Sequence, residues 1–204
     1  MNLNLFALFA LSVLFYSCEK EESSYTEVSG VVYTKGTSDP IANALVSLEW
    51  WDPAVFGETR YYVDSTRTNS AGEFKVAGDL PQYQEYYVIA HADKHFETEF
   101  SQGLKPNISR GKKQNLSLSL IPYGWVKMNI RKTIGNDYLR INRIPGGSIN
   151  SFFTSSDDTI YSRILGNQQV KIDCFRYKNT NHREHLEYFI NTLAMDTVEI
   201  TIEF

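Results

Sequence analysis

The sequence predicts an all-β protein built from two strand-rich halves. Three observations support this fold class: apolar and polar residues alternate in many short segments, turn residues separate these segments, and no segment has the periodicity of a long amphipathic helix. The composition agrees, because thirteen Tyr and twelve Phe residues against only twelve Gly residues favour strands over disorder.

The stretch 66–90 carries the clearest pattern. The letters N-S-A-G at 69–72 predict a tight turn, because Asn tolerates a positive φ and Gly adopts one without steric cost. Phe74 and Val76 alternate with polar residues after this turn, which is typical of a half-buried strand. The run 86–90 repeats the alternation and predicts the next strand.

Similar segments on either side of this stretch complete a first domain at 28–121. Seven or so short strands with turns between them predict a Greek-key β-sandwich. The remaining expected strands are 28–33, 44–50, 60–68, 91–100 (continuing from the run before it) and 115–120, and the expected loops are 34–43, 52–59 and 104–114.

Within this half, the motifs G-V-V-Y, P-I-A-N-A-L-V-S-L, T-R-T-N-S-A-G-E-F, L-P, Y-V-I-A and L-S-L-S-L follow one another over about ninety residues. Their order resembles the carboxypeptidase regulatory-like domain, a transthyretin-like (prealbumin-like) sandwich. Members of that family are non-catalytic modules attached to peptidases, transporters and cell-surface proteins. The resemblance therefore implies folding support, display or partner contact, without chemistry of its own.

The second half, 122–204, predicts a second small β-sandwich-like domain. Pro122 marks the boundary because proline cannot donate a hydrogen bond to a central ladder. The segment 184–193 has some helix propensity, but its alternating Leu, Tyr and Ile residues indicate a strand. The other expected strands are 125–131, 137–141, 149–154, 158–165, 169–177 and 197–204.

The pairing of the two halves resembles the paired modules of small Bacteroidota lipoproteins. A domain of this size buries only roughly 60–65% of the surface of its unfolded chain, so contact between the halves would add to their stability. The sequence leaves open whether they form one unit or two separate domains.

The N-terminal segment predicts export. Residues 2–17 contain no charged side chain and are followed at once by polar residues, which is typical of a signal peptide rather than a membrane-spanning helix. Ser17 immediately precedes Cys18, and the segment L-F-Y-S-C-E-K-E-E at 14–22 resembles the lipobox of bacterial lipoproteins. The resemblance implies that 1–17 is a cleaved signal peptide and that Cys18 is lipidated. The alternative is an ordinary signal peptide with a chance cysteine.

The residues E-K-E-E after Cys18 resemble the Lys-plus-acidic export signal on surface lipoproteins of the Bacteroidota. The resemblance implies a lipid-anchored outer-membrane protein exposed at the cell surface, with 18–27 as a flexible tether. A lipidated Cys18 cannot form a disulfide. Cys174, in the alternating run 169–177, is therefore predicted to be a free thiol and a small core residue.

The strongest concentration of aromatic residues lies around the expected loop 52–59. Consecutive Trp residues on a strand face opposite ways, so one of the pair is expected to point outward. An exposed ring there could stack on a sugar ring or seat a protein partner, and Trp51, if exposed, would mark that face. The alternative is that the loop covers it. The candidate ligand-binding residues are Trp50, Trp51, Phe56, Tyr61 and Tyr62.

Charge and motifs argue against several other functions. The net charge is −4 with both signs dispersed and no basic block, so we do not expect a nucleic-acid partner. No nucleophile motif or phosphate-binding loop is present, so we expect neither an enzyme nor a cofactor. On a strand, His182 and His185 of the segment H-R-E-H-L-E point to opposite faces, so we expect no metal site there.

Three short segments, D-S-T, D-T-I and D-T-V, resemble the acceptor sequence for periplasmic O-glycosylation in Bacteroidota. The resemblance implies modification at Ser65, Thr159 and Thr197.

Together these patterns predict a non-enzymatic, membrane-anchored lipoprotein that acts as a display, adhesion or assembly module at the cell surface. The alternative is a glycan-binding accessory protein of an outer-membrane nutrient-uptake system. The expected partners are the membrane, through the lipid, and either a protein or a glycan.

Overall fold

The computed structural model describes residues 23–54, 57–82, 84–98, 106–133, 135, 137–142, 144–147, 149, 151–178 and 182–204. Within these ranges the chain folds into thirteen strands in four sheets, so the predicted all-β fold class is confirmed. The same ranges contain no helix that is long and apolar enough to cross a membrane.

The first lobe contains two three-stranded sheets, with the strand orders β4-β1-β6 and β3-β2-β5. Strand β1 pairs antiparallel with β4 and parallel with β6. The strands are β1 (Tyr25–Thr34), β2 (Leu45–Ala54), β3 (Gly57–Arg67), β4 (Glu73–Asp79), β5 (Glu85–His91) and β6 (Lys113–Leu120).

The second lobe contains a three-stranded sheet, β10-β7-β13, and a four-stranded sheet, β12-β11-β8-β9. Strand β7 pairs antiparallel with β10 and parallel with β13. The strands are β7 (Tyr123–Arg131), β8 (Tyr138–Asn142), β9 (Ser151–Thr154), β10 (Asp158–Leu165), β11 (Gln168–Lys178), β12 (His182–Thr192) and β13 (Thr197–Glu203).

The two lobes repeat one strand topology. In each lobe the first strand is central in one sheet, between an antiparallel neighbour and the parallel last strand. The second sheets also correspond, because β3-β2-β5 and β9-β8-β11 have the same order and the same antiparallel pairing. Strand β12 has no counterpart in the first lobe and extends the sheet beyond β11.

Each lobe has its own apolar core between its two sheets, built from the inward positions of alternating strands. The residues of the first core include Val28, Val32, Val46, Leu48, Val76, Val88, Leu118 and Leu120. The residues of the second core include Val126, Met128, Ile130, Leu139, Ile141, Val170, Ile172 and Cys174.

Two expected boundaries in the first lobe differ from the structure because strand pairing continues further. Strand β1 begins at Tyr25, within the expected tether 18–27, because it pairs with β4 from that residue onward. Strands β2 and β3 run through most of the expected loop 52–59, where Asp52 pairs with Thr59. The polar and proline-containing sequence there looks like a loop, but it forms the end of a long hairpin.

Two further expectations have opposite outcomes. The expected strand 91–100 is wrong for 92–98, because β5 ends at His91 and the chain turns at 92–95, where Lys94 has a φ of 56°; residues 99–100 lie outside the described residues. The expected strand at 184–193 is confirmed as β12, which pairs with β11 along its whole length. Cross-strand pairing there overrides the helix propensity of the segment.

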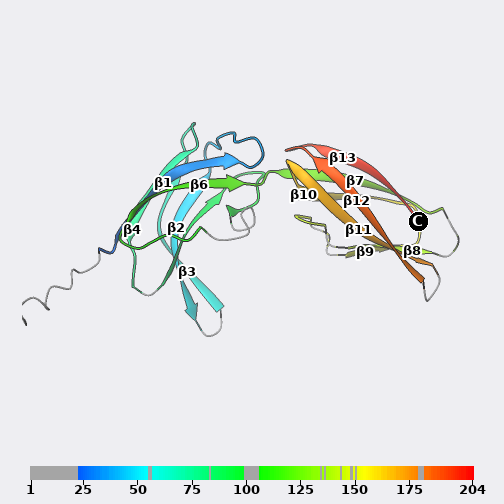
Figure 1. The fold of residues 1–204 in the computed structure, drawn as a ribbon, viewed down its shortest axis with the longest axis horizontal. Coiled ribbons are helices and arrows are strands. Elements are labelled where there is room, and N and C mark those ends of the chain that lie inside the picture. The colour runs from blue at the N-terminus through cyan, green and yellow to red at the C-terminus, as the bar shows by residue number, and fades with distance from the viewer. Residues whose placement is uncertain are drawn as a thin grey trace, which may run out of the picture.

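Backbone hydrogen bonds join the two lobes where β6 passes into β7. The Phe96 N–H donates to the Ile121 carbonyl at 2.8 Å, and the Tyr123 N–H donates to the Lys94 carbonyl at 2.8 Å. Residues 92–96 of the first lobe are therefore hydrogen-bonded to the residues on both sides of Pro122, between β6 and β7. The lobes lie end to end and are in contact (Figure 1).

The strand directions determine at which end of the molecule each chain terminus lies. Thr34 pairs with Leu120 beside the joint, so Tyr25, at the start of β1, lies at the opposite end of the first lobe (Figure 1). Strand β7 starts at the joint with Tyr123, and β13 runs parallel to it, so Phe204 lies at the far end of the second lobe. The chain thus begins its fold at one end of the long axis and finishes at the other.

Candidate functional site

The structure buries Trp51. Its side chain is 1% exposed, and its ring contacts that of Tyr87 edge-on with centroids 5.1 Å apart. The guanidinium carbon of Arg60 lies 4.1 Å from the Trp51 ring centroid. Tyr87 comes from β5, which pairs beside β2, and sequence pattern alone does not reveal that neighbour. This burial removes the basis for a binding face at Trp51.

The other members of the predicted aromatic cluster have mixed positions. Trp50 is half-buried against the first core and stacks on Tyr61, with ring centroids 3.9 Å apart and an interplanar angle of 9°. Tyr61 is 42% exposed and Tyr62 is 72% exposed. Phe56 lies outside the described residues. Among the described residues of this hairpin, the exposed aromatic surface therefore consists of two tyrosines rather than a tryptophan platform.

The predicted glycosylation positions share one local geometry. Ser65, Thr159 and Thr197 are all exposed and lie within strands. At each position the backbone N–H donates to a carboxylate oxygen of the preceding Asp, at 2.7 to 2.8 Å. Each hydroxyl is therefore presented next to an Asp side chain that is held against the backbone.

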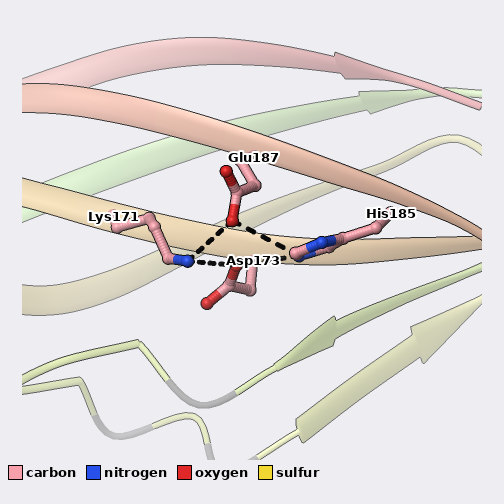
Figure 2. A network of polar contacts seen from close by, with 4 residues as sticks. All are labelled: Lys171, Asp173, His185 and Glu187. Carbon is pink, nitrogen blue, oxygen red and sulfur yellow. Dashed lines mark hydrogen bonds and ion pairs between the residues drawn. The ribbon is translucent and has the colours of Figure 1, made fainter.

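A network of four charged or titratable side chains lies on the solvent face of the β11–β12 pair (Figure 2). Lys171 Nζ lies 3.0 Å from Asp173 Oδ1 and 2.7 Å from Glu187 Oε1. His185 Nε2 lies 2.9 Å from Asp173 Oδ1 and 3.8 Å from Glu187 Oε1. The two carboxylates thus lie between the ammonium on one side and the imidazole on the other.

The pKa shifts in this network follow from its hydrogen bonds. Burial raises the pKa of Asp173, but hydrogen bonds from Lys171 and His185 outweigh it and hold the pKa below its ordinary value. Hydrogen bonds from Lys171 to Glu187 and then to Asp173 raise the pKa of the lysine. Both shifts stabilise the charged forms, as expected for an ion-pair network.

The ligating atoms of Asp173, His185 and Glu187 lie within 4.8 Å of one another, which is close enough to share a metal ion. The Lys171 ammonium, however, already contacts both carboxylates. The arrangement is therefore explained by ion pairing. Sequence reasoning missed this group because Asp173 comes from a different strand, although the spacing of His185 and Glu187 places them on one face.

The same solvent face carries a row of aromatic and cationic side chains across all four strands. The register places Phe153 opposite Arg140, Arg140 opposite Phe175, and Phe175 opposite His185. The Arg140 guanidinium carbon lies 5.3 Å from the Phe153 ring centroid. The rings of Phe175 and His185 are stacked with centroids 4.7 Å apart. The register thus places the Arg140 cation between the rings of Phe153 and Phe175.

A second row lies next to the first, further from the joint. Tyr138 and Tyr177 are paired and stacked, with ring centroids 4.4 Å apart and an interplanar angle of 4°. Arg183 pairs with Tyr177, and its guanidinium carbon lies 3.9 Å from the Phe175 ring centroid. Sequence reasoning missed these residues because only the register of β8, β9, β11 and β12 brings them together.

A cavity of about 420 Å³ lies at the joint between the lobes. The guanidinium carbon of Arg163 lies 4.4 Å from the Tyr123 ring centroid and 5.0 Å from that of Phe96, so the cation helps to hold the lobes together. Two histidines also lie here: His91 Nδ1 is 3.5 Å from Glu97 Oε1, and His95 Nε2 is 3.3 Å from the hydroxyl of Thr34. The lining residues are His91, Ala92, His95, Phe96, Glu97, Tyr123 and Arg163.

Cys174 is a free, buried residue of the second core, as predicted from its alternating run. Burial, with a smaller contribution from the Asp173 charge, raises the pKa of its thiol to about 12. The thiol is therefore chemically inert at neutral pH in the folded state. Cys18 lies outside the described residues.

No family model matches the chain, and no curated protein matches it. Among solved structures, the minor pilin GBS52 of Streptococcus agalactiae matches with a TM-score of 0.38 and 11% identity, covering 87% of this chain and 94% of the pilin. A streptococcal ancillary pilin matches at 0.35 and 11% identity, covering 89% of this chain and 63% of the pilin.

The TIE protein of Bacillus anthracis matches with a TM-score of 0.35 and 10% identity, covering 88% of this chain and 34% of that protein. A 3-chlorocatechol 1,2-dioxygenase from Rhodococcus opacus matches at 0.32 and 10% identity, covering 50% of this chain and 62% of the enzyme. The chain thus spans about a third of the first of these proteins. At these TM-scores the likeness assigns neither a family nor a function.

Proposed function

We propose that the chain is a non-enzymatic lipoprotein, anchored in the outer membrane through Cys18, that acts as a display, adhesion or assembly module at the cell surface. The observation that carries this proposal is the sequence of the N-terminal segment. The uncharged residues 2–17 end in Ser17, Cys18 follows, and the Lys-plus-acidic segment E-K-E-E comes next. The same segment motivates an assignment to the surface lipoproteins of the Bacteroidota.

The position of the first strand along the molecule supports this role. Strand β1 begins at Tyr25, a few residues after Cys18, at the end of the molecule that is farthest from the second lobe (Figure 1). A lipid at Cys18 would therefore hold the first lobe near the membrane and the second lobe away from it. Strand β1 has ten residues, which corresponds to about 30 Å at roughly 3.3 Å per residue.

We also propose that the first lobe is a carboxypeptidase regulatory-like module. The motif order in the sequence motivates the assignment, and two small antiparallel-rich sheets around one core are compatible with it. The repeated topology extends this proposal to the second lobe. Such a module would contribute a rigid scaffold and a surface for contacts, without catalysis.

The experiment that tests the anchor is the intact mass and amino terminus of the mature protein, produced in a bacterium that processes lipoproteins. We expect a chain that begins at Cys18 and carries diacyl or triacyl mass. Cys18→Ser is the matched control, because it removes the acceptor thiol and should abolish both the lipid and membrane association. A mature wild-type chain that is cut elsewhere and carries no lipid would overturn the proposal.

A second candidate function is a glycan-binding accessory of an outer-membrane nutrient-uptake system. Exposed rings on the second lobe favour it, since Phe153 is 56% exposed and Tyr138 is 40% exposed. A glycan array separates the two functions. Specific sugar binding that depends on these rings favours the accessory role, whereas capture of a membrane protein without sugar binding favours assembly.

A further inference from the structure

The second lobe carries a solvent face with an unusual side-chain composition. We call it the arginine–aromatic face and define it as Tyr138, Arg140, Phe153, Phe175, Tyr177 and Arg183. These residues come from β8, β9, β11 and β12, and they occupy the positions opposite to the second core. Arg183 comes from the added strand β12, which has no counterpart in the first lobe.

The face lies at the end of the second lobe that is remote from the first. Strand β11 starts at Gln168, just after the Gly166–Asn167 turn beside the joint, and runs away from it to Lys178. Tyr177 and its partners Tyr138 and Arg183 therefore lie near the outer end of the sheet. In an anchored molecule this end is the most distant from the membrane.

Two rings of the face are well exposed. Phe153 is 56% exposed and Tyr138 is 40% exposed, so each presents much of its ring to solvent. Four neighbouring strands span about 14 Å at roughly 4.8 Å per spacing, which is the scale of a short run of sugar rings. The C–H faces of a pyranose ring are apolar and pack on an aromatic face, as the exposed rings here would allow.

The two arginines of the face have no carboxylate partner in the described part of the chain. Among the described residues, neither Arg140 nor Arg183 has an ion-pair partner, whereas Lys171 is neutralised by Asp173 and Glu187. The Nε atom of Arg140 is buried and has no hydrogen-bond partner within that part of the chain. A carboxylate or sulfate group pairs well with a guanidinium group that has no carboxylate partner, because the anion accepts two parallel hydrogen bonds. The guanidinium groups lie beside rings, so an anion bound there would have an apolar ring at its side.

We propose that the arginine–aromatic face binds an acidic polysaccharide, whose rings pack on Phe153 and Tyr138 and whose carboxylate or sulfate groups pair with Arg140 and Arg183. The proposal rests on the proposed function in one respect, since it takes the second lobe to be exported. Nucleic acid fits less well, because its binding draws on many phosphate contacts. This face offers two free arginines, and Asp173 and Glu187 lie in the adjoining row.

The test uses the full chain, processed in a bacterium and purified in detergent. Four polymers serve as probes: polygalacturonate for carboxylate, dextran sulfate for sulfate, neutral dextran, and a single-stranded DNA oligonucleotide. Dissociation constants are measured by biolayer interferometry. We expect one or both acidic polysaccharides to bind and neutral dextran not to bind. We also expect DNA to bind more weakly, and the difference between the two acidic polymers identifies the anionic group.

The variants separate charge from ring contacts. Arg140→Gln with Arg183→Gln, and separately Phe153→Ala with Tyr138→Ala, should each weaken acidic-polysaccharide binding by about tenfold or more. Arg131→Gln and Tyr161→Ala are matched controls from the other sheet of the same lobe, where both residues are well exposed. The controls should change binding by less than about twofold.

The proposal is overturned if neither acidic polysaccharide binds. It is also overturned if neutral dextran binds as tightly as the acidic polysaccharides, or if DNA binds more tightly than they do. A third contradicting result is a loss of acidic-polysaccharide binding in the control variants as large as the loss in the face variants. Circular dichroism confirms that each variant is folded, and the exposed single substitution Arg183→Gln decides the outcome if the double variant is not. If the protein is lipidated but does not bind acidic polysaccharide, the proposed binding at the arginine–aromatic face is contradicted and the proposed lipid anchor is not. If the mature wild-type chain carries no lipid but binds acidic polysaccharide, the proposed lipid anchor is contradicted and the proposed binding at the face is not.

Discussion

The side-chain amide of Asn167 in the second lobe donates a hydrogen bond to the backbone carbonyl of Lys35 in the first lobe, at 3.1 Å. The same amide group accepts from the Ala194 N–H through its oxygen, at 2.9 Å. Asn167 has a φ of 54° in the turn between β10 and β11, a conformation that Asn adopts more readily than most residues. One side chain therefore ties two turns of the second lobe to a turn of the first.

We expect Asn167→Ala to destabilise the protein by about 1–3 kcal/mol, because it removes both hydrogen bonds and leaves a Cβ-bearing residue at positive φ. Asn167→Gly is the matched variant: it loses the same bonds but tolerates the backbone conformation, so it should retain about 1 kcal/mol more stability. Urea denaturation measures both. Small-angle X-ray scattering should show a broader range of inter-lobe distances in each variant, and an unchanged profile would contradict the role of Asn167 at the joint.

The ion-pair network on β11 and β12 makes a prediction about acid. Hydrogen bonds from Lys171 and His185 hold the pKa of Asp173 below its ordinary value of 3.8, despite burial. A carboxyl group with a lowered folded pKa stabilises the fold above its unfolded pKa, and this contribution is lost as the pH falls through the lower folded value. The wild type should therefore lose stability as the pH falls through the ordinary value of 3.8 and below it.

Asp173→Asn should lack this part of the acid dependence, because its side chain does not titrate. The measurement is the urea midpoint of both proteins at several pH values, with the difference between them shrinking toward the acid end. High salt should also reduce the difference, since the network is partly exposed. A constant difference across the pH range would show that the Asp173 charge does not contribute.

A related prediction concerns metal. Because the Lys171 ammonium lies 3.0 Å and 2.7 Å from the two carboxylates, Zn²⁺ would have to displace it to use Asp173, His185 and Glu187 together. The thermal midpoint of the wild type should therefore change little with added Zn²⁺ or EDTA. Lys171→Met removes the competing cation, and a Zn²⁺-dependent rise should be larger in this variant. A strong Zn²⁺ response of the wild type would contradict the ion-pair interpretation.

The sequence predicts the strands better than it predicts which side chains meet at the surface. Period-two alternation identified most strands, including β12 against its helix propensity, because alternation reflects burial of one face. The end of the β2–β3 hairpin was missed, since Asp52 and Pro53 resemble turn residues and only pairing with β3 makes them a strand. The sequence leaves the exposure of Trp51 open for a similar reason, because its neighbour Tyr87 comes from β5.

The arginine–aromatic face lay outside the reach of sequence patterns altogether. Arg140 and Phe175 are far apart in the chain and become neighbours only through the β8–β11 register. A shift by one residue would turn one of them toward the core, so no pattern within a single strand specifies the pair. The repeated topology of the two lobes was equally hidden, because it consists of hydrogen-bonded neighbours rather than of similar residues.

The buried thiol of Cys174 should be protected from alkylation. Native protein treated with N-ethylmaleimide at pH 8 should show no label on the Cys174 peptide, whereas protein in urea should be labelled fully. Burial raises the pKa of this thiol from 9.0 to about 12, so the thiol ionises at a lower pH in the unfolded chain than in the folded protein. The free energy of unfolding should therefore fall as the pH rises from 9.0 toward about 12. Rapid labelling of the folded protein would contradict the burial.

Cys174→Ser should cost about 1–3 kcal/mol, because it places a hydroxyl among apolar side chains of the second core. Cys174→Ala is the matched variant, which removes the sulfur without adding a polar group and should cost less. The two free energies of unfolding, measured in urea, separate the loss of packing from the burial of a polar atom. A serine variant as stable as the alanine variant would show that the site offers the hydroxyl a hydrogen-bond acceptor.

The exposed hydroxyls of Ser65, Thr159 and Thr197 give the last prediction. If they carry O-linked glycans, secreted wild-type protein should be heavier than its sequence, and the triple Ala variant should lose the excess mass. The fold should be unaffected, because the hydrogen bond from each residue to the preceding Asp uses the backbone N–H, which alanine retains. Ser155→Ala, at another exposed position without a preceding Asp, is the control and should keep the added mass. Equal masses of the wild type and the triple variant, after correction for the substitutions, would reject modification at these positions.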